Sequence, residues 1–127
     1  MENPSDRKYT KEHEWVTVDG DTGTIGITDH AQHLLTDVVF VELPKLGKQT
    51  EQSKTCAVVE SVKSVSDVYA PVSGEVIEIN TALESAPETI NRDAFGEGWI
   101  AKIRIKDHNE LNKLMSAEEY TEFIKEH

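Results

Sequence analysis

Lys63 is the residue of this sequence whose setting best suits covalent chemistry. Two β-rich stretches, residues 55–60 and 67–70, approach and leave it, and only a short tip remains between them. A primary amine at such a tip can enter the active site of a modifying enzyme, and acylation to an amide would remove its positive charge. The pattern therefore predicts a handle for a covalently attached group, against the alternative of an ordinary solvated lysine in a turn.

Residues that could act as nucleophiles or metal ligands lack the surroundings that such chemistry needs. Cys56 is the single cysteine, so no internal disulfide can form, and the residues around it predict a small buried side chain in a strand. A catalytic thiol would instead need a partly exposed, electropositive setting. Among the five histidines, His30 and His33 lie at i and i+3 but lack a third ligand, so we expect no metal site.

Short strands predominate among the elements that would hold the tip. Besides the two strands around Lys63, the predicted strands are residues 14–18, 22–27, 38–43, 74–80 and 99–105. The first two form a predicted hairpin, because Asp19 and Gly20 supply a turn with a positive φ angle. The last strand alternates, and its predicted buried face consists of Trp99, Ala101, Ile103 and Ile105.

Helices are predicted to be few and short. The first begins at a Thr28 or Asp29 cap and ends at Leu35, the second is opened by Asp107, and the last follows a capping box of Ser116 and Glu119. Ala31, Leu34 and Leu35 are predicted to share one face of the first helix. Residues 82–91 include Pro87 and several small polar residues, which predicts a loop with one helical turn.

Many short strands with small helices predict a mainly β fold, a flattened β-barrel or sandwich with short flanking helices and a C-terminal helix. The chain of 127 residues, 37% of them hydrophobic, suffices for one core and is too short for two ordinary domains. We therefore expect a single domain over residues 1–127, with a β core at about 9–106 and a helical segment at about 107–127.

The charge of the chain limits its partners. Thirteen basic and 24 acidic residues give a net charge of −11, which would repel nucleic acid and anionic membranes. No apolar run reaches the roughly 20 residues that span a bilayer, and the first residues lack the features of a secretion signal. The sequence predicts a cytoplasmic protein, or one of the mitochondrial matrix if a transit peptide has been removed.

Several stretches match the pattern of one known family in order and spacing: residues 9–16, 25–32, 37–44, 59–63, 66–76 and 96–99. On these stretches almost the whole chain resembles the H protein of the glycine cleavage system. The resemblance implies a lipoyl domain of the barrel-sandwich hybrid type, with lipoate attached to Lys63 through an amide. Lysine and lipoate together would form an arm on the order of 14 Å long, about a dozen bonds at ~1.2 Å each.

The resemblance also implies a function and a set of partners. A non-catalytic, monomeric carrier would move the aminomethyl group of glycine from a pyridoxal-phosphate-dependent glycine decarboxylase (P protein) to a tetrahydrofolate-dependent aminomethyltransferase (T protein). Dihydrolipoyl dehydrogenase (L protein) would then reoxidise the arm, and lipoate-attaching enzymes would install it. Glu14 and Asp67 match cleft carboxylates that contact the loaded arm in the family, against the alternative of two ordinary surface acids.

Some positions depart from the family's pattern, and two of them bear on the cleft and on the helix beside it. Leu34 stands where some members place a cleft histidine, and a one-residue step on a helix rotates a side chain by ~100°, so His33 cannot substitute for it. The resemblance therefore does not predict a histidine in the cleft from this helix. Thr36 occupies a position where glycine is common after the helix, so the usual left-handed cap should be lost or compensated.

Other functions fit the sequence less well. A depot that supplies lipoyl groups to other dehydrogenases would use the same fold and lysine, so the sequence does not separate it from the carrier. A biotinyl carrier usually has methionine on both sides of its lysine, whereas Val62 and Ser64 flank Lys63 here. An enzyme acting by itself would need a nucleophile–base pair or a metal cluster, and neither has a recognisable spacing.

Overall fold

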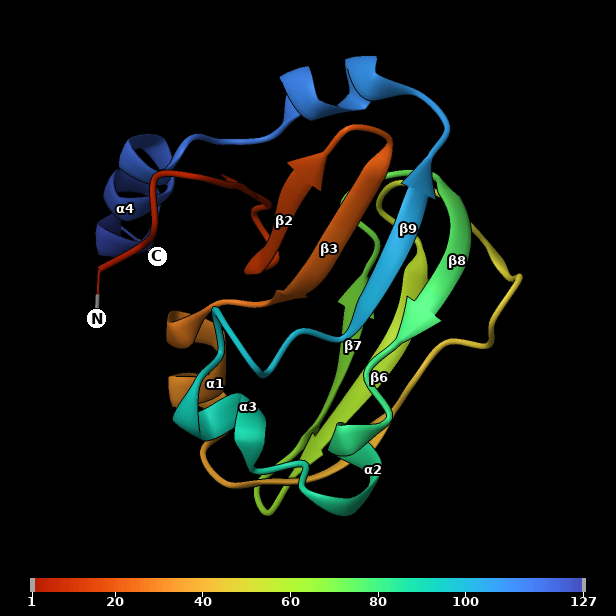
Figure 1. Cartoon of the computed structure of the whole chain (residues 1–127). Helices are drawn as coiled ribbons and strands as arrows, with labels where there is room; N and C mark the ends of the chain where they lie inside the picture. The colour runs from red at the N-terminus through yellow and green to blue at the C-terminus, as the bar shows by residue number, and fades with distance from the viewer. Residues whose placement is uncertain (1, 127) are drawn as a thin grey trace.

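Two antiparallel sheets form the body of the protein (Figure 1), in a computed structural model that describes residues 2–126. The larger sheet has the order β1-β2-β3-β9-β8-β5, with β1 Lys8–Tyr9, β2 Glu14–Asp19, β3 Thr22–Ile27, β9 Ala101–Ile105, β8 Gly74–Ile79 and β5 Gln49–Thr50. The smaller sheet has the order β4-β6-β7, with β4 Val38–Glu42, β6 Thr55–Ser61 and β7 Val65–Tyr69.

Within residues 2–126, five helical segments connect or flank these strands. They are α1 Asp29–Leu35, α2 Ala82–Ser85, α3 Thr89–Arg92, the 3₁₀ segment η1 His108–Lys113 and the C-terminal α4 Ala117–Glu126. The predicted mainly β fold is confirmed. Of the two shapes that the prediction allowed, the sandwich is observed, because the two sheets remain separate and do not close into a barrel. Within residues 2–126, no helix has the length and apolar character that crossing a bilayer requires.

The predicted hairpin and the alternating strand are both present. Asp19 pairs with Thr22 across a turn in which Gly20 has a φ of +62°, a conformation that glycine adopts without steric cost. In β9, Ala101, Ile103 and Ile105 point into the core and alternate with more exposed residues, as predicted. Trp99 precedes the strand and packs in a separate cluster, so its predicted place on this face was wrong.

The main core fills the space between the sheets. Val16 and Ile25 of the larger sheet and Val59 of the smaller sheet are almost fully buried in it, and Ile103 completes the layer. Burial of a side chain of this size stabilises the fold by about 1.5–3 kcal/mol. The core therefore fixes the position of β6, the strand that leads to Lys63.

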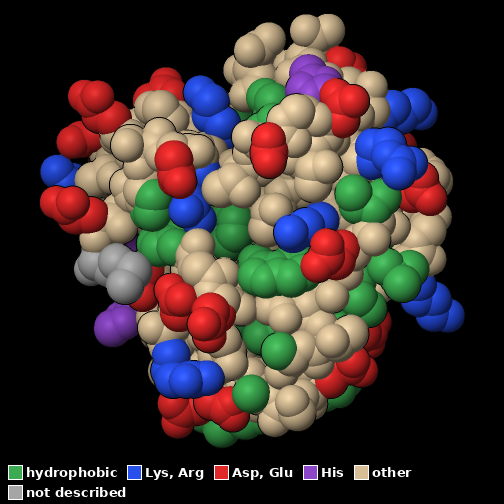
Figure 2. All heavy atoms as spheres, viewed as in Figure 1, with side chains coloured by type: hydrophobic (Ala, Val, Ile, Leu, Met, Phe, Trp, Pro, Cys, Tyr) green, Lys and Arg blue, Asp and Glu red, His purple; other side chains and the backbone are tan. Residues whose placement is uncertain are grey.

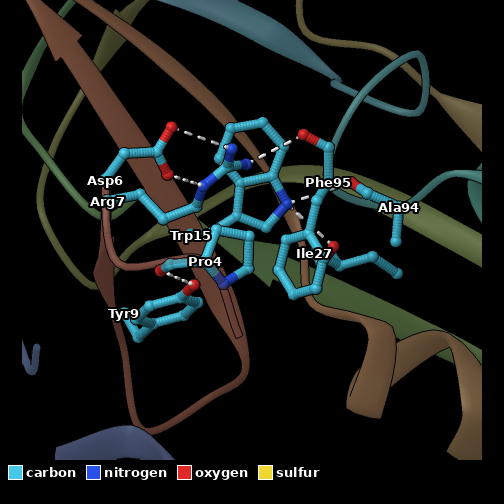
Figure 3. A network of polar contacts seen from close by, with 8 residues as sticks. All are labelled: Pro4, Asp6, Arg7, Tyr9, Trp15, Ile27, Ala94 and Phe95. Carbon is cyan, nitrogen blue, oxygen red and sulfur yellow. Dashed lines mark hydrogen bonds and ion pairs between the residues drawn. The ribbon is translucent and has the colours of Figure 1, made fainter. Parts of the chain in front are cut away.

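A second, aromatic cluster joins the two ends of the chain. Tyr9, Trp15 and Tyr120 are buried in it, and the ring of Tyr120 in α4 stacks on Tyr9 in β1 at 4.8 Å. Figure 1 shows α4 beside the N-terminal segment. Figure 3 shows how Arg7 extends the cluster: its guanidinium lies 4.6 Å from the centre of the Trp15 ring and donates to the Phe95 carbonyl. These contacts hold the start of β2 in place.

The helices differ in part from the predictions. Helix α1 has the predicted bounds, and the Thr28 hydroxyl caps it by accepting from Ala31 N at 3.1 Å. Of the apolar residues predicted to share one face of this helix, Leu34 is 56% exposed, whereas the polar Gln32 is buried. Gln32 can be buried because its amide groups are bonded to Asp29 and Asn91.

Residues 82–91 form more helix than predicted. Two short helices, α2 and α3, replace the predicted single turn, and each inserts one apolar side chain into the core, Leu83 and Ile90. The C-terminal capping box is confirmed, since Ser116 N donates to the Glu119 carboxylate at 2.9 Å and Glu119 N donates to the Ser116 hydroxyl at 3.1 Å. The predictions of the helix caps were therefore correct, because in each cap the two interacting residues lie within one helical turn of each other.

Candidate functional site

Lys63 lies at the tip between β6 and β7, and its side chain is exposed. The Ser61 hydroxyl accepts from Lys63 N at 3.1 Å and from Ser64 N at 3.0 Å, while Ser61 N donates to Ser64 O at 2.8 Å. Val62 N also donates to Asp37 O at 3.0 Å, which ties the tip to the segment before β4. The backbone of the tip is therefore held by hydrogen bonds, although the lysine side chain extends into solvent.

A small cleft of about 110 Å³ opens beside this tip, between α1 and the exposed edge of β7. Its apolar walls include Ile27, Val59 and Val68, and Leu34 and Leu35 contribute from α1. Three carboxylates also line it, those of Glu12, Glu14 and Asp67. A cleft with apolar walls and several carboxylates suits a ligand that is mostly apolar but ends in a cation.

The structure brings Glu14 and Asp67 together at the cleft but gives them different surroundings. Asp67 lies on β7, four residues after Lys63, and its side chain is exposed. Glu14 is only 1% exposed. Its carboxylate accepts from the Thr10 hydroxyl and, at 3.1 Å, from Tyr69 N. Because Tyr69 belongs to the smaller sheet, Glu14 connects the two sheets, and the alternative of a surface acid was wrong for it.

The burial of Glu14 changes its acidity. Removal from water disfavours the charged form and raises the pKa of the Glu14 carboxyl to about 7, although its bonds to Thr10 and Tyr69 oppose the shift. The nearby Glu12 charge adds to the increase. At neutral pH Glu14 is therefore divided between its neutral and charged forms. A cation that entered the cleft would favour the charged form.

The structure places a histidine in the cleft that the sequence did not reveal. His13 lines the cleft from the turn before β2, while Leu34 lines it from α1 and His33 does not. His13 has a φ of 72°, which is uncommon for a residue with a side chain. Its Nδ1 lies 2.8 Å from the Tyr120 hydroxyl. No local pattern could indicate this position, because Tyr120 lies 107 residues further along the chain.

A larger hollow of about 340 Å³ lies on the other side of Glu14. Its wall is shared with the cleft only at Glu12 and Glu14, and the rest comes from other segments: Tyr9, Thr10, Lys11, Gln52, Ser53, Tyr69, Ala70, Pro71, Lys113, Leu114 and Met115. Neither α1 nor the part of β7 next to the tip, Ser66 and Asp67, contributes to it, whereas both line the cleft. Despite its smaller volume, we therefore assign the cleft beside Asp67 as the candidate site for a group on Lys63.

Cys56 lies apart from this chemistry, as the sequence predicted. It is buried in β6, and burial raises the pKa of its thiol to about 12, with a further contribution from the charge of Glu14. A thiol with such a pKa is almost entirely protonated near neutral pH and is a poor nucleophile. Among residues 2–126, no three side chains of the metal-ligating types lie close enough together to hold a metal ion.

The fold and the site together define a class of protein. A small sandwich that presents a lysine on a fixed hairpin tip, beside a cleft, is typical of carrier domains that hold a prosthetic group on a lysine arm. The family model for the glycine cleavage H-protein matches residues 7–127. The chain belongs to the glycine cleavage system H protein family.

Individual relatives agree with this assignment. The chain is 54% identical to the glycine cleavage system H protein of Pseudoalteromonas translucida, over 97% of this chain and 96% of that protein. It is 52% identical to the H protein of Thermus thermophilus, over 98% and 97%. The crystal structure of an H protein from Mycobacterium marinum superposes with a TM-score of 0.90 at 38% identity and covers 97% of this chain and 99% of that one.

Proposed function

We propose that Lys63 carries lipoate in amide linkage and that residues 1–127 act as one carrier domain. In this role the chain takes the aminomethyl group of glycine from a glycine decarboxylase and delivers it to an aminomethyltransferase, and a dihydrolipoyl dehydrogenase restores the arm. The observation that carries the proposal is the exposed Lys63 side chain on a backbone tip held by Ser61. Membership of the H protein family supports the choice of lipoate.

The geometry of the chain is compatible with an arm of this kind. An arm on the order of 14 Å is about as long as the four residues from Lys63 to Asp67 when fully extended, which is at most about 13–14 Å. The attached group can therefore reach the cleft as well as extend away from the protein. Lipoate supplies a cyclic disulfide that accepts a carbon nucleophile and leaves a free thiol beside the new thioether.

The side chains of the protein would bind and shield the arm rather than perform chemistry on it. The apolar walls from Ile27, Val59 and Leu35 suit the hydrocarbon part of the arm. Asp67 and Glu14 supply acceptors for the ammonium of the loaded arm, a charge-assisted hydrogen bond in each case. Exclusion of water from this group would lengthen its life between partners. The chain is thus proposed to be a non-catalytic subunit.

Lys63→Arg tests the proposal, because arginine keeps the positive charge but offers no amine that can be acylated. We expect the variant to fold normally, since exposed substitutions change stability by about 0.5 kcal/mol or less. Its mass after expression with lipoate-attaching enzymes should lack the lipoyl increment, and it should not support glycine–bicarbonate exchange with the decarboxylase. Lys54→Arg is the control, since Lys54 is also exposed but lies at the far end of β6.

Two outcomes would contradict the proposal. A lipoyl increment on Lys63→Arg would place the attachment elsewhere in the chain. A wild-type protein that carries the lipoyl group but supports no exchange would instead favour the depot that supplies other dehydrogenases.

A further inference from the structure

Tyr120 of α4 is buried, and its hydroxyl lies between two segments that lead into the lining of the cleft. The hydroxyl oxygen is 2.8 Å from the Thr28 hydroxyl and 2.8 Å from His13 Nδ1. Burial raises the pKa of the Tyr120 hydroxyl to about 12, so it remains protonated near neutral pH. It has one proton to donate and lone pairs to accept, and it can therefore satisfy both partners at once.

Each of the two partners leads directly into a wall of the cleft. Thr28 caps α1 by accepting from Ala31 N, and Ala31, Leu34 and Leu35 of that helix line one wall. His13 is itself a lining residue and precedes Glu14 in the chain. Tyr120 is not a lining residue, so it can affect the cleft only through these neighbours.

The C-terminal helix holds this hydroxyl firmly. Tyr120 is fully buried, and its ring is stacked on Tyr9 with only 8° between the ring planes. A backbone bond from Thr28 N to His13 O, at 3.0 Å, already joins the two walls. The Tyr120 hydroxyl adds a side-chain link from a third element. A link that is anchored outside the cleft can set the separation of its walls.

We propose that Tyr120 is a positioning residue for the cleft, which fixes α1 relative to His13 and Glu14 and so keeps the cleft shaped for the arm on Lys63. This inference rests on the proposed function as far as the arm is concerned. The structural part of it concerns only residues of this chain and can be measured without any attached group. Helix α4 then contributes to shielding, although no residue of it lines the cleft.

Tyr120→Phe tests the proposal, because it keeps the stacked ring and removes only the hydroxyl. Tyr9→Phe is a matched control from the same ring pair, since the Tyr9 hydroxyl donates to the Pro4 carbonyl at 2.6 Å and has no bond to the cleft (Figure 3). Two quantities are compared among both variants and the wild type. One is the amide hydrogen exchange of α1 in the unmodified protein. The other is the spontaneous decay of the aminomethyl-loaded protein, measured by intact mass without aminomethyltransferase.

We expect Tyr120→Phe to increase exchange at Ala31 N and to speed the decay, each by about 2- to 12-fold, the factor that corresponds to the net loss of one hydrogen bond. Tyr9→Phe should leave both quantities near their wild-type values, even if it lowers the denaturation midpoint by a similar amount. Exchange at Ala31 N that does not change in Tyr120→Phe would overturn the proposal. So would equal increases in the two variants, since they would indicate a loss of general stability.

The outcomes also separate this inference from the proposed function. If the wild-type protein cannot be loaded with the aminomethyl group, the proposed function is wrong, and the exchange comparison still decides whether Tyr120 positions α1. If loading succeeds and α1 is loosened but the decay remains at the wild-type rate, the role of Tyr120 in shielding is wrong and the carrier function is not affected.

Discussion

Asp67 and Glu14 are both carboxylates of the cleft, but their surroundings suit them to different tasks. Asp67 is exposed on an edge strand, so it is accessible to the end of the arm. Glu14 is buried, with two hydrogen-bond donors in contact with it and a pKa raised to about 7 by burial. Asp67 is therefore the better candidate for a solvated carboxylate that attracts a cation. Glu14 is the better candidate for a carboxyl group that becomes charged when a cation lies beside it.

Asp67→Asn should weaken the shielding of the loaded arm. The substitution keeps the size of the side chain but removes the charge that attracts an ammonium, an interaction of about 1–3 kcal/mol. A loss of ~1.4 kcal/mol would speed the spontaneous decay of the aminomethyl-loaded protein by up to about tenfold. The decay is followed by intact mass in the absence of the aminomethyltransferase.

Asp21→Asn is the control for this measurement. Asp21 is an exposed acid in the turn between β2 and β3, at the opposite end of the molecule from the β6–β7 tip (Figure 1). Its substitution should leave both the decay and the lipoylation of Lys63 unchanged. Equal decay rates for Asp67→Asn and the wild type would mean that Asp67 makes no contact with the arm.

At the scale of elements, the junction between α1 and β4 departs from a relaxed backbone. Thr36 follows the helix with a φ of 65° and a ψ of −146°, a region that only glycine occupies without strain. One local and one long-range hydrogen bond maintain this conformation: Thr36 N donates to Gln32 O at the end of the helix, and Thr36 O accepts from the Asn91 amide at 2.8 Å. These bonds therefore compensate for the absence of the glycine that is common at this position in the family.

Thr36→Gly should stabilise the protein by about 1 kcal/mol. The strain of a residue in such a region is of order 1–3 kcal/mol, and the greater freedom of glycine in the unfolded chain offsets about 0.5–1 kcal/mol of the gain. Both backbone hydrogen bonds remain possible. Urea denaturation at constant pH measures the change as a higher midpoint.

Thr81→Gly provides the matched comparison for this junction. Thr81 is also exposed and precedes a short helix, but its φ is −64° and its side chain makes no capping hydrogen bond. Its replacement should therefore lower the unfolding free energy by about 0.5–1 kcal/mol. A lower midpoint for Thr36→Gly as well would show that the conformation at Thr36 carries no strain.

At the scale of the whole molecule, one buried acid differs from the many exposed ones. Acidic side chains are spread over the face seen in Figure 2, in keeping with a net charge of −11, and most of them remain in water. Among the acids of residues 2–126, Glu14 is the one that is almost fully buried, where it connects the two sheets through Tyr69 N. Its ionisation is therefore coupled to the stability of the entire sandwich.

Glu14→Gln should remove part of the pH dependence of unfolding. The folded-state pKa of about 7 is higher than the usual value of 4.5, so the folded protein holds its proton more tightly than the unfolded chain. This contribution is fully present below about pH 4.5 and is lost as the pH rises through about 7. At about 1.4 kcal/mol per pKa unit, the loss for the wild type is about 3 kcal/mol.

The measurement is the difference in unfolding free energy between wild type and Glu14→Gln at pH 5 and at pH 8, from urea denaturation. In the variant the amide oxygen can accept from Tyr69 N, and the amide nitrogen takes the position that faces the Thr10 hydroxyl, which can accept from it. The variant does not titrate, so it should gain stability relative to the wild type as the pH rises. The other acids are common to both proteins, and their effects cancel in the difference. A difference that does not depend on pH would show that Glu14 titrates normally.

The features that could be predicted from the sequence are those that depend on neighbours within a few residues. The Gly20 turn, the Thr28 cap of α1 and the Ser116–Glu119 capping box all arise from contacts at most four residues apart, and each was predicted correctly. Only the class of fold, mainly β, could be predicted from the sequence, and the order of the strands in the two sheets could not. The exposed Lys63 tip was predictable because strand-forming residues on both sides leave a short turn between them.

The assembly of the candidate site depends on tertiary contacts, which could not be predicted from the sequence. Glu14 could be named from the sequence, but its burial follows from a bond to Tyr69, 55 residues away. His13 reaches the cleft, and Tyr120 contacts Thr28 across 92 residues, without any local pattern that indicates either position. Strand register and helix docking are set by the packing of the whole core. Contacts between distant segments are therefore not encoded in the periodicity of any one of them.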